Sequence, residues 1–194
     1  MWDTCTGECI QDTMKHGENP IRAMAVLDNG LLVSLELIRE AVSYNDVKVW
    51  NTRRGEAVAT IPVRGYCLCI CPLGGSRFAI GHGIHDHSVS IFTTSHSITE
   101  STDFVEYERT AVLHGHASSV IALLRVGDRL VSCGNDKALK VWDLGSEKCV
   151  KTIKTQARAL ASPVSSFFSD SSGLTYSCYM ERKMSHEIHV IPIH

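Results

Sequence analysis

The sequence lacks the features that usually mark a secreted, membrane-spanning or nucleic-acid-binding chain. No apolar run approaches the roughly 18 residues that a membrane-spanning helix needs. The start, MWDTCTGECIQD, has neither the basic nor the apolar stretch of a secretory signal, and no N-x-S/T sequon occurs. The formal net charge is only −2, so no broad basic surface for nucleic acid is predicted. We therefore expect a cytoplasmic or nuclear protein that is not secreted and binds neither membrane nor nucleic acid.

The chain also lacks the usual signatures of catalysis and metal binding. No serine lies in a G-x-S-x-G turn, no Gly-rich phosphate loop is present, and the cysteines include no C-x-x-C pair. We therefore predict no enzymatic activity, no catalytic residue, no cofactor and no bound metal. In an intracellular protein the cysteines are expected to be reduced and mostly buried as small hydrophobic side chains. They are Cys5, Cys9, Cys67, Cys69, Cys71, Cys133, Cys149 and Cys178.

What the sequence does contain is an ordinary apolar fraction and a repeated pattern. Apolar residues make up 44% of the chain and charged residues 21%, which is typical of a folded domain. Within residues 114–153, four short apolar runs alternate with turn residues such as Gly127-Asp128 and Gly145. Four short strands separated by such turns predict an antiparallel meander. The runs are 120–124, 130–132, 138–143 and 149–153.

The same pattern recurs along the chain. The segment DVKVWNTRRGEAVATI (46–61) aligns with ALKVWDLGSEKCVKTI (138–153), and weaker copies cover 65–94 and 163–191. The anchor residues Trp2, Trp50, Phe92, Trp142 and Ile191 follow one another at intervals of 42 to 50 residues. A four-stranded propeller blade repeats at about 40–45 residues, so these units are slightly long. The extra length is placed in three loops, Leu35–Val42, Thr94–Phe104 and Glu181–Ser185.

The segment HGH…LVSCGNDKALKVWD resembles the WD-repeat family. Its matching positions are Gly115-His116, Ser132, Asp136 and Trp142-Asp143, at family spacing within about thirty residues. The unit at 16–61 is similar but degraded, with His16-Gly17 in reversed order. The resemblance implies an all-β propeller of four-stranded antiparallel blades.

We expect a single domain over residues 1–194 with about four blades. Members of the family usually have more blades than this, so we expect an incomplete ring from a longer parent. Strand exchange by residues 8–14 is an alternative that would close four blades. The expected units are 1–15 (partial), 16–62, 63–113, 114–155 and 156–194 (partial).

The resemblance also implies a role for four polar or aromatic side chains. In the family, the corresponding His, Ser, Asp and Trp form a buried hydrogen-bonded network that stabilises a blade, which assigns His116, Ser132, Asp136 and Trp142 to structure rather than to a catalytic triad. The function implied is a non-catalytic protein–protein interaction scaffold or adaptor. Its partners would be other proteins or peptides.

Two alternative functions stay open at this point. One is a metal-binding or redox site, either at His82, His85 and His87 or at the cysteine triplet Cys67, Cys69 and Cys71, which an unbroken strand would place on one face. The other is a truncated product without independent function. The segment LELIREAV (35–42) is compatible with a short helical insertion into a hairpin.

Overall fold

All regular structure in the described chain is β-structure. The computed structural model describes residues 5–8, 19–36, 44–98, 103–154, 166–170, 173–180 and 185–191. Each regular element in these ranges is a strand, and they contain no helix of the length and hydropathy needed to cross a membrane. The all-β prediction is therefore confirmed.

The strands form four antiparallel sheets, each in meander order. The first sheet contains β1 (Ile21–Val26), β2 (Leu31–Glu36), β3 (Tyr44–Asn51) and β4 (Glu56–Arg64). The second contains β5 (Cys67–Gly74), β6 (Arg77–His82), β7 (Val89–Ile98) and β8 (Asp103–Leu113). The third contains β9 (Val120–Val126), β10 (Arg129–Gly134), β11 (Ala138–Asp143) and β12 (Lys148–Lys154). The fourth has three described strands, β13 (Ser166–Asp170), β14 (Gly173–Met180) and β15 (Ser185–Ile191).

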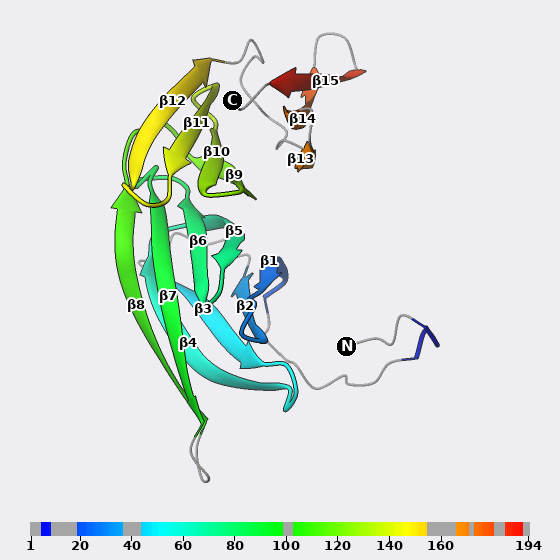
Figure 1. The fold of residues 1–194 in the computed structure, drawn as a ribbon, viewed down its shortest axis with the longest axis vertical. Helices are drawn as coiled ribbons and strands as arrows, with labels where there is room; N and C mark the ends of the chain where they lie inside the picture. Colours follow the sequence, from blue (N-terminus) through cyan, green and yellow to red (C-terminus); the bar gives the residue numbers. More distant parts are fainter. Residues whose placement is uncertain are drawn as a thin grey trace.

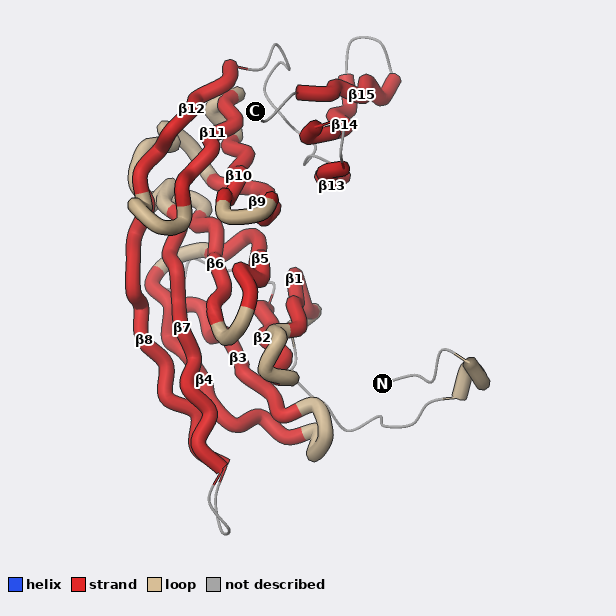
Figure 2. The backbone as a smooth tube through the Cα atoms, viewed as in Figure 1, coloured by secondary structure: helices blue, strands red, loops and turns tan. Residues whose placement is uncertain are grey.

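The sheets follow one another along an arc (Figures 1 and 2). The first strands of consecutive sheets lie side by side, since β1 contacts β5, β5 contacts β9 and β9 contacts β13. The last strands β4, β8 and β12 lie on the outer rim, where β4 contacts β8. This is the predicted arrangement of four-stranded blades, and in the described part of the chain the ring is incomplete.

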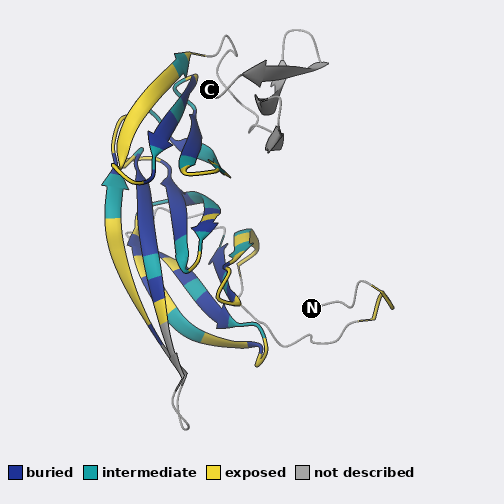
Figure 3. Ribbon diagram, in the orientation of Figure 1, coloured by how far each residue is buried: buried dark blue, intermediate teal, exposed yellow. Residues whose placement is uncertain are grey.

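Two apolar cores hold neighbouring sheets together. One lies between the first and second sheets and includes Val33, Val49 and Phe78, all fully buried. The other lies between the second and third sheets and includes Ile91 and Leu130. Strand alternation explains both cores, because successive side chains of a central strand point to opposite neighbouring sheets. Figure 3 shows this burial along the middle strands, whereas the rim strand β12 is largely exposed.

The sheets also repeat one another in register. Trp50, Phe92, Trp142 and Ile191 occupy equivalent positions in the third strands, opposite Leu32, Phe78, Leu130 and Leu174 respectively. In the first three sheets the pairing of the third and fourth strands shifts immediately before this anchor residue. Such a β-bulge increases local twist, so one irregularity recurs at the same point of three blades.

In all three of the expected loops, some of the residues belong to strands. Leu35 belongs to β2, where it is fully buried and pairs with Val47, while residues 37–43 lie outside the described residues. The prediction of a loop over Thr94–Phe104 was wrong for most of its length, because β7 continues to Ile98 and β8 begins at Asp103. Polar side chains do not prevent strand pairing where one face of the strand is open to solvent, and Thr is a residue that favours strands. Of the Glu181–Ser185 loop, Ser185 already lies in β15 and residues 181–184 are outside the described residues.

Candidate functional site

The third sheet brings together all four residues assigned to the polar network. His116 precedes β9, Ser132 lies in β10, Asp136 lies in the β10–β11 turn and Trp142 lies in β11. The His116 Nε2 atom is 2.7 Å from Ser132 Oγ, and Nδ1 is 2.9 Å from Asp136 Oδ2. The Trp142 indole N–H donates to the same Ser132 Oγ at 2.8 Å. The four side chains therefore form one continuous chain of hydrogen bonds.

One order of donors satisfies every member of this chain. Trp142 can only donate, so Ser132 Oγ accepts from the indole and directs its own O–H at His116 Nε2. The imidazole is then neutral, and its Nδ1–H donates to the Asp136 carboxylate. A protonated His116 would carry a second N–H toward Ser132 Oγ, and the serine hydroxyl would need another acceptor. The network therefore favours neutral His116.

The charge states follow the same logic. Burial lowers the pKa of His116 below 6.5, although the neighbouring Asp136 carboxylate opposes this shift. Burial tends to raise the pKa of Asp136, but hydrogen bonds from the Ala117 N–H, at 2.8 Å, and from His116 and the Ala138 N–H bring it below 3.8. At neutral pH the pair is an ionised carboxylate and a neutral imidazole.

We expect acid to weaken the fold through this pair. Because the folded pKa of His116 lies below 6.5, the unfolded state binds more protons as the pH falls through that value, and folding stability decreases. The lowered pKa of Asp136 acts in the same direction, and its contribution to folding stability is lost as the pH falls below 3.8. Urea unfolding at several pH values, with an NMR titration of the His116 ring, would check this. A free energy of unfolding that stays constant from pH 7 to about pH 5 would contradict it.

Gly134, at the end of β10, is a member of the site that sequence reasoning missed. A Cβ atom at this position would overlap His116 Nδ1 and Asp136 Oδ1, so only glycine leaves the room that the pair occupies. In the sequence, Gly134 stands out only as part of the turn Gly134-Asn135-Asp136, and other turn residues would be expected there equally.

The first two sheets carry different versions of the network. In the first sheet, the Trp50 indole N–H donates to Ser34 Oγ at 2.7 Å, which matches the Trp142–Ser132 pair. The expected partner His16 lies outside the described residues. In the second sheet, the serine and tryptophan positions hold Ile80 and Phe92, and both are buried.

The second sheet contains a polar group at other positions along its strands. His82 ends β6, and its Nε2 atom is 2.8 Å from Ser90 Oγ of β7. Asp86 in the β6–β7 turn has Oδ2 at 3.9 Å from His82 Nδ1, beyond hydrogen-bonding distance. The residue types match those of the third sheet. Here, however, the histidine lies in strand β6 itself, and the Asp86 carboxylate is too far from it for a hydrogen bond.

The two clusters considered for metal binding are dispersed. His82 is buried with Ser90, whereas His85 is exposed and His87 is half-buried, both with left-handed backbone conformations. Cys67 packs in the core between the first two sheets, while Cys69 and Cys71 face the third sheet. The expectation of one shared cysteine face was wrong, because the β5–β6 register shifts between Cys67 and Cys69. Among the residues that the structure describes, no three His, Cys, Asp or Glu side chains are placed to hold a metal ion.

We expect the β5 cysteines to be chemically inert in the folded protein. Burial raises the pKa of Cys67 to about 12 and that of Cys71 to about 11, and it raises the pKa of Cys69 as well. The thiolate is the reactive form, so native alkylation should modify the exposed Cys149 and spare these three. Peptide mapping after iodoacetamide treatment, with and without urea, would measure this. Native labelling of Cys69 as fast as Cys149 would contradict it.

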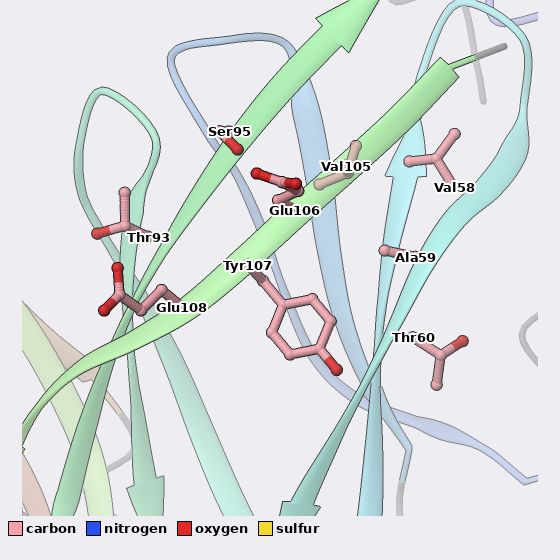
Figure 4. Close-up of a pocket in the computed structure, with 9 residues that line it drawn as sticks. All are labelled: Val58, Ala59, Thr60, Thr93, Ser95, Val105, Glu106, Tyr107 and Glu108. Atoms are coloured by element: carbon pink, nitrogen blue, oxygen red, sulfur yellow. The ribbon is translucent and has the colours of Figure 1, made fainter.

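The outer rim between the first two sheets is hollowed into two neighbouring cavities. One, of about 630 Å³, lies against β4, β7 and β8 (Figure 4). Its lining consists of Val58, Ala59, Thr60, Thr93, Ser95, Val105, Glu106, Tyr107 and Glu108. In Figure 4 the Tyr107 ring extends from β8 toward β4. The second, of about 510 Å³, shares Tyr107 with the first. It is also lined by Ile61, Pro62, Val63, Arg64, His82, Asp86, Phe92 and Arg109.

Several known proteins are similar to this chain over part of their length. No protein-family model matches the chain. A CCR4-associated factor 4 homolog from Candida glabrata is 37% identical over 109 residues, covering 56% of this chain and 19% of that protein. The WD repeat-containing protein 18 of Danio rerio is 29% identical over 134 residues, covering 64% of this chain and 31% of that protein. The nuclear distribution protein PAC1 of C. glabrata is 27% identical over 175 residues, covering 78% and 37%. The chain thus spans less than two fifths of the length of these relatives.

Solved structures show the same fold. The crystal structure of the RRP9 WD40 repeats matches with a TM-score of 0.62 at 17% identity, covering 91% of this chain and 53% of that one. The structure of U3-55K matches with a TM-score of 0.61 at 17% identity, covering 91% and 54%.

Proposed function

We propose that this chain is a WD-repeat β-propeller protein and that it is a non-catalytic scaffold that binds other proteins, which its similarity to WD-repeat relatives and its fold support. The same family reading supports a cytoplasmic or nuclear location. Its relatives are named for WD repeats or for nuclear distribution, and these names describe those proteins.

One observation carries the proposal. The residues that resemble a Ser-His-Asp triad are engaged in hydrogen bonds within the fold. Ser132 is fully buried, and its oxygen accepts a hydrogen bond from the Trp142 indole N–H and is also hydrogen-bonded to His116. A nucleophilic serine must reach a substrate carbonyl, and this one is enclosed. The open cavities at the rim lie between the first and second sheets, away from this network, and such hollows suit docking of a partner.

The test is capture of partners by the chain in cells. A tagged chain and a tagged Arg53→Glu variant, altered in an exposed turn, should enrich the same proteins over a tag-only control in quantitative mass spectrometry. Failure of both to enrich any protein reproducibly would contradict the scaffold function.

We also propose that residues 1–194 fold as one domain built from the units 1–15, 16–62, 63–113, 114–155 and 156–194. The two apolar cores that join three successive sheets support a single cooperative unit. The expected result is a sharp melt of a monomer in size-exclusion chromatography and calorimetry. A broad, non-cooperative transition would favour the alternative of a truncated product.

A further inference from the structure

We propose that an exposed apolar face of the first sheet binds the fourth sheet of a second copy of this chain, so that two chains together close one ring of blades. We call this surface the open face, and it consists of the side chains of Ile21, Met24 and Val26 on β1. The proposal goes beyond the scaffold function, because it concerns how the chain assembles, and a monomer could bind partners equally well.

The three side chains of the open face are large, apolar and exposed. Ile21, Met24 and Val26 are 46%, 64% and 61% exposed, and Figure 3 shows exposed residues along β1. A register shift follows Ile21, so the three residues pair with alternate residues of β2, which are Glu36, Ser34 and Leu32. Alternate residues of a strand share one face, so all three side chains of β1 lie on the same side of the sheet. Exposed apolar residues that gather in this way mark interaction surfaces.

The third sheet has the same positions covered. Counted from the anchor residues of the third strands, Ile21 corresponds to Val120 of β9, and Met24 corresponds to Leu123. The pairing of β9 shifts at the same point as that of β1. Val120 is fully buried, and Leu123 packs against the core that the third sheet shares with the second. The sheet that precedes the third sheet therefore covers these two positions.

The second sheet repeats this arrangement. The residues of β5 that correspond to Ile21 and Met24 are Cys67 and Ile70, and the register of β5 shifts between them as well. Both pack in the core that the second sheet shares with the first. Among the three sheets whose side chains are described, only the first exposes these positions. The open face thus has the form of an interface between blades, and no described sheet covers it.

The packing inside the chain defines what fits this face. Each of the two cores joins this face of one sheet to the opposite face of the sheet before it. The open face therefore fits the opposite face of a further sheet. The fourth sheet lies at the other end of the arc from the first, and no described sheet follows it (Figure 1). Placing a fourth sheet against a first sheet would continue the series of contacts that the chain already contains.

The extent of the chain favours a second copy as the source of that sheet. The chain covers 53% and 54% of the two solved WD40 structures while 91% of its own length is matched. Two copies therefore supply about the number of strands in one such structure. A two-fold axis would place each first sheet beside the fourth sheet of the other chain, which closes the assembly at two chains. The competing occupant is a further sheet of a longer chain, and it would leave this chain monomeric.

We expect the pairing to be reversible. Trp50 and Ser34 lie on the same side of the first sheet and are already buried, so the exposed part of this side is confined to β1. Burying three partly exposed side chains at each contact gains little against the cost of association. The chain is therefore the monomer expected above in dilute solution, and higher concentration drives the pairing.

The experiment is analytical ultracentrifugation of the full chain over about a hundredfold range of concentration. Met24→Lys places a charge at a position that is covered in the second and third sheets. Val26→Arg is a control for register, because the β9 residue that corresponds to Val26 is Arg125, whose guanidinium lies against Gly74 of the second sheet. Val150→Lys is a control for exposure, because Val150 is 53% exposed on the rim strand β12. Circular dichroism confirms that each variant is folded.

The mass of the wild type should rise from one chain to two as the concentration increases, and no further. Met24→Lys should raise the dissociation constant at least about tenfold, whereas Val26→Arg and Val150→Lys should change it less than about threefold. Hydrogen–deuterium exchange at high and low concentration locates the contact. Both β1 and the strands of the fourth sheet should exchange more slowly at high concentration.

Four results would overturn the proposal. They are a monomer at every concentration, growth beyond two chains, equal weakening by Met24→Lys and Val26→Arg, and slower exchange of β1 without slower exchange of the fourth sheet. None of these results bears on the scaffold function, which the capture of partners tests separately. Met24→Lys should capture the same proteins as the wild type.

Discussion

Replacing Trp142 with alanine should lower the free energy of unfolding by about 4 kcal/mol, the largest effect we expect from a single substitution. Trp142 is 2% exposed and belongs to the core between the second and third sheets. Its removal leaves a cavity between two sheets that cannot easily close, because the strands on both sides are fixed by their own pairing. It also leaves Ser132 without the indole donor that it accepts at 2.8 Å.

Trp142→Phe separates these two contributions. Phenylalanine retains much of the apolar area but has no N–H, so we expect a loss of about 1–2 kcal/mol. The second sheet already has Phe92 at this register position, and there the serine is replaced by Ile80, so neither side of the pair is polar. Phenylalanine opposite Ser132 lacks that compensation.

Urea unfolding followed by circular dichroism measures both variants. Val150→Ala is the matched control, because Val150 lies on the rim strand β12 of the same sheet and is 53% exposed. Its effect should stay within about 0.5 kcal/mol. If Trp142→Ala differs from Val150→Ala by less than about 1 kcal/mol, then the anchor position does not hold the second and third sheets together.

Local patterns made much of this architecture readable from the sequence. The network residues His116, Ser132, Asp136 and Trp142 fall within one repeat, and the resemblance of that repeat to the WD-repeat family singled them out. The register of Trp50 and Phe92 follows from the same repeat. Alternation of apolar and turn residues predicts hairpins, because each involves neighbouring segments only.

Features that depend on packing between sheets could not be read in this way. Gly134 is required because a side chain from before β9 folds back over the end of β10, which no local pattern reports. The hydrogen bond between His82 and Ser90 lies in a sheet where Ile80 and Phe92 occupy the positions of Ser132 and Trp142, so the repeat pattern does not point to it. The rim cavities arise where β4 of one sheet meets β8 of the next, so their lining is scattered along the sequence.

Ser132→Ala is the second large effect, and it tests whether the network acts as one unit. The serine oxygen accepts from Trp142 and its hydroxyl serves His116, so alanine leaves an indole N–H and an imidazole nitrogen without partners in a buried site. Each orphaned group costs on the order of 1–3 kcal/mol, and we expect a total loss of about 3 kcal/mol. Ser146→Ala, which removes an exposed hydroxyl bonded to Asp143 in the same sheet, should cost less than about 0.5 kcal/mol.

A double-mutant cycle of Ser132→Ala with Trp142→Phe then measures the coupling. With phenylalanine at 142 there is no indole N–H that could be left without a partner, so Ser132→Ala should cost at least about 1 kcal/mol less than in the wild type. The NMR titration of His116 adds a second readout, because loss of the serine donor removes a hydrogen bond that favours the neutral ring, and the pKa of His116 should rise. Additive effects of the two substitutions, together with an unchanged His116 titration, would show that the four side chains pack side by side without forming a connected network.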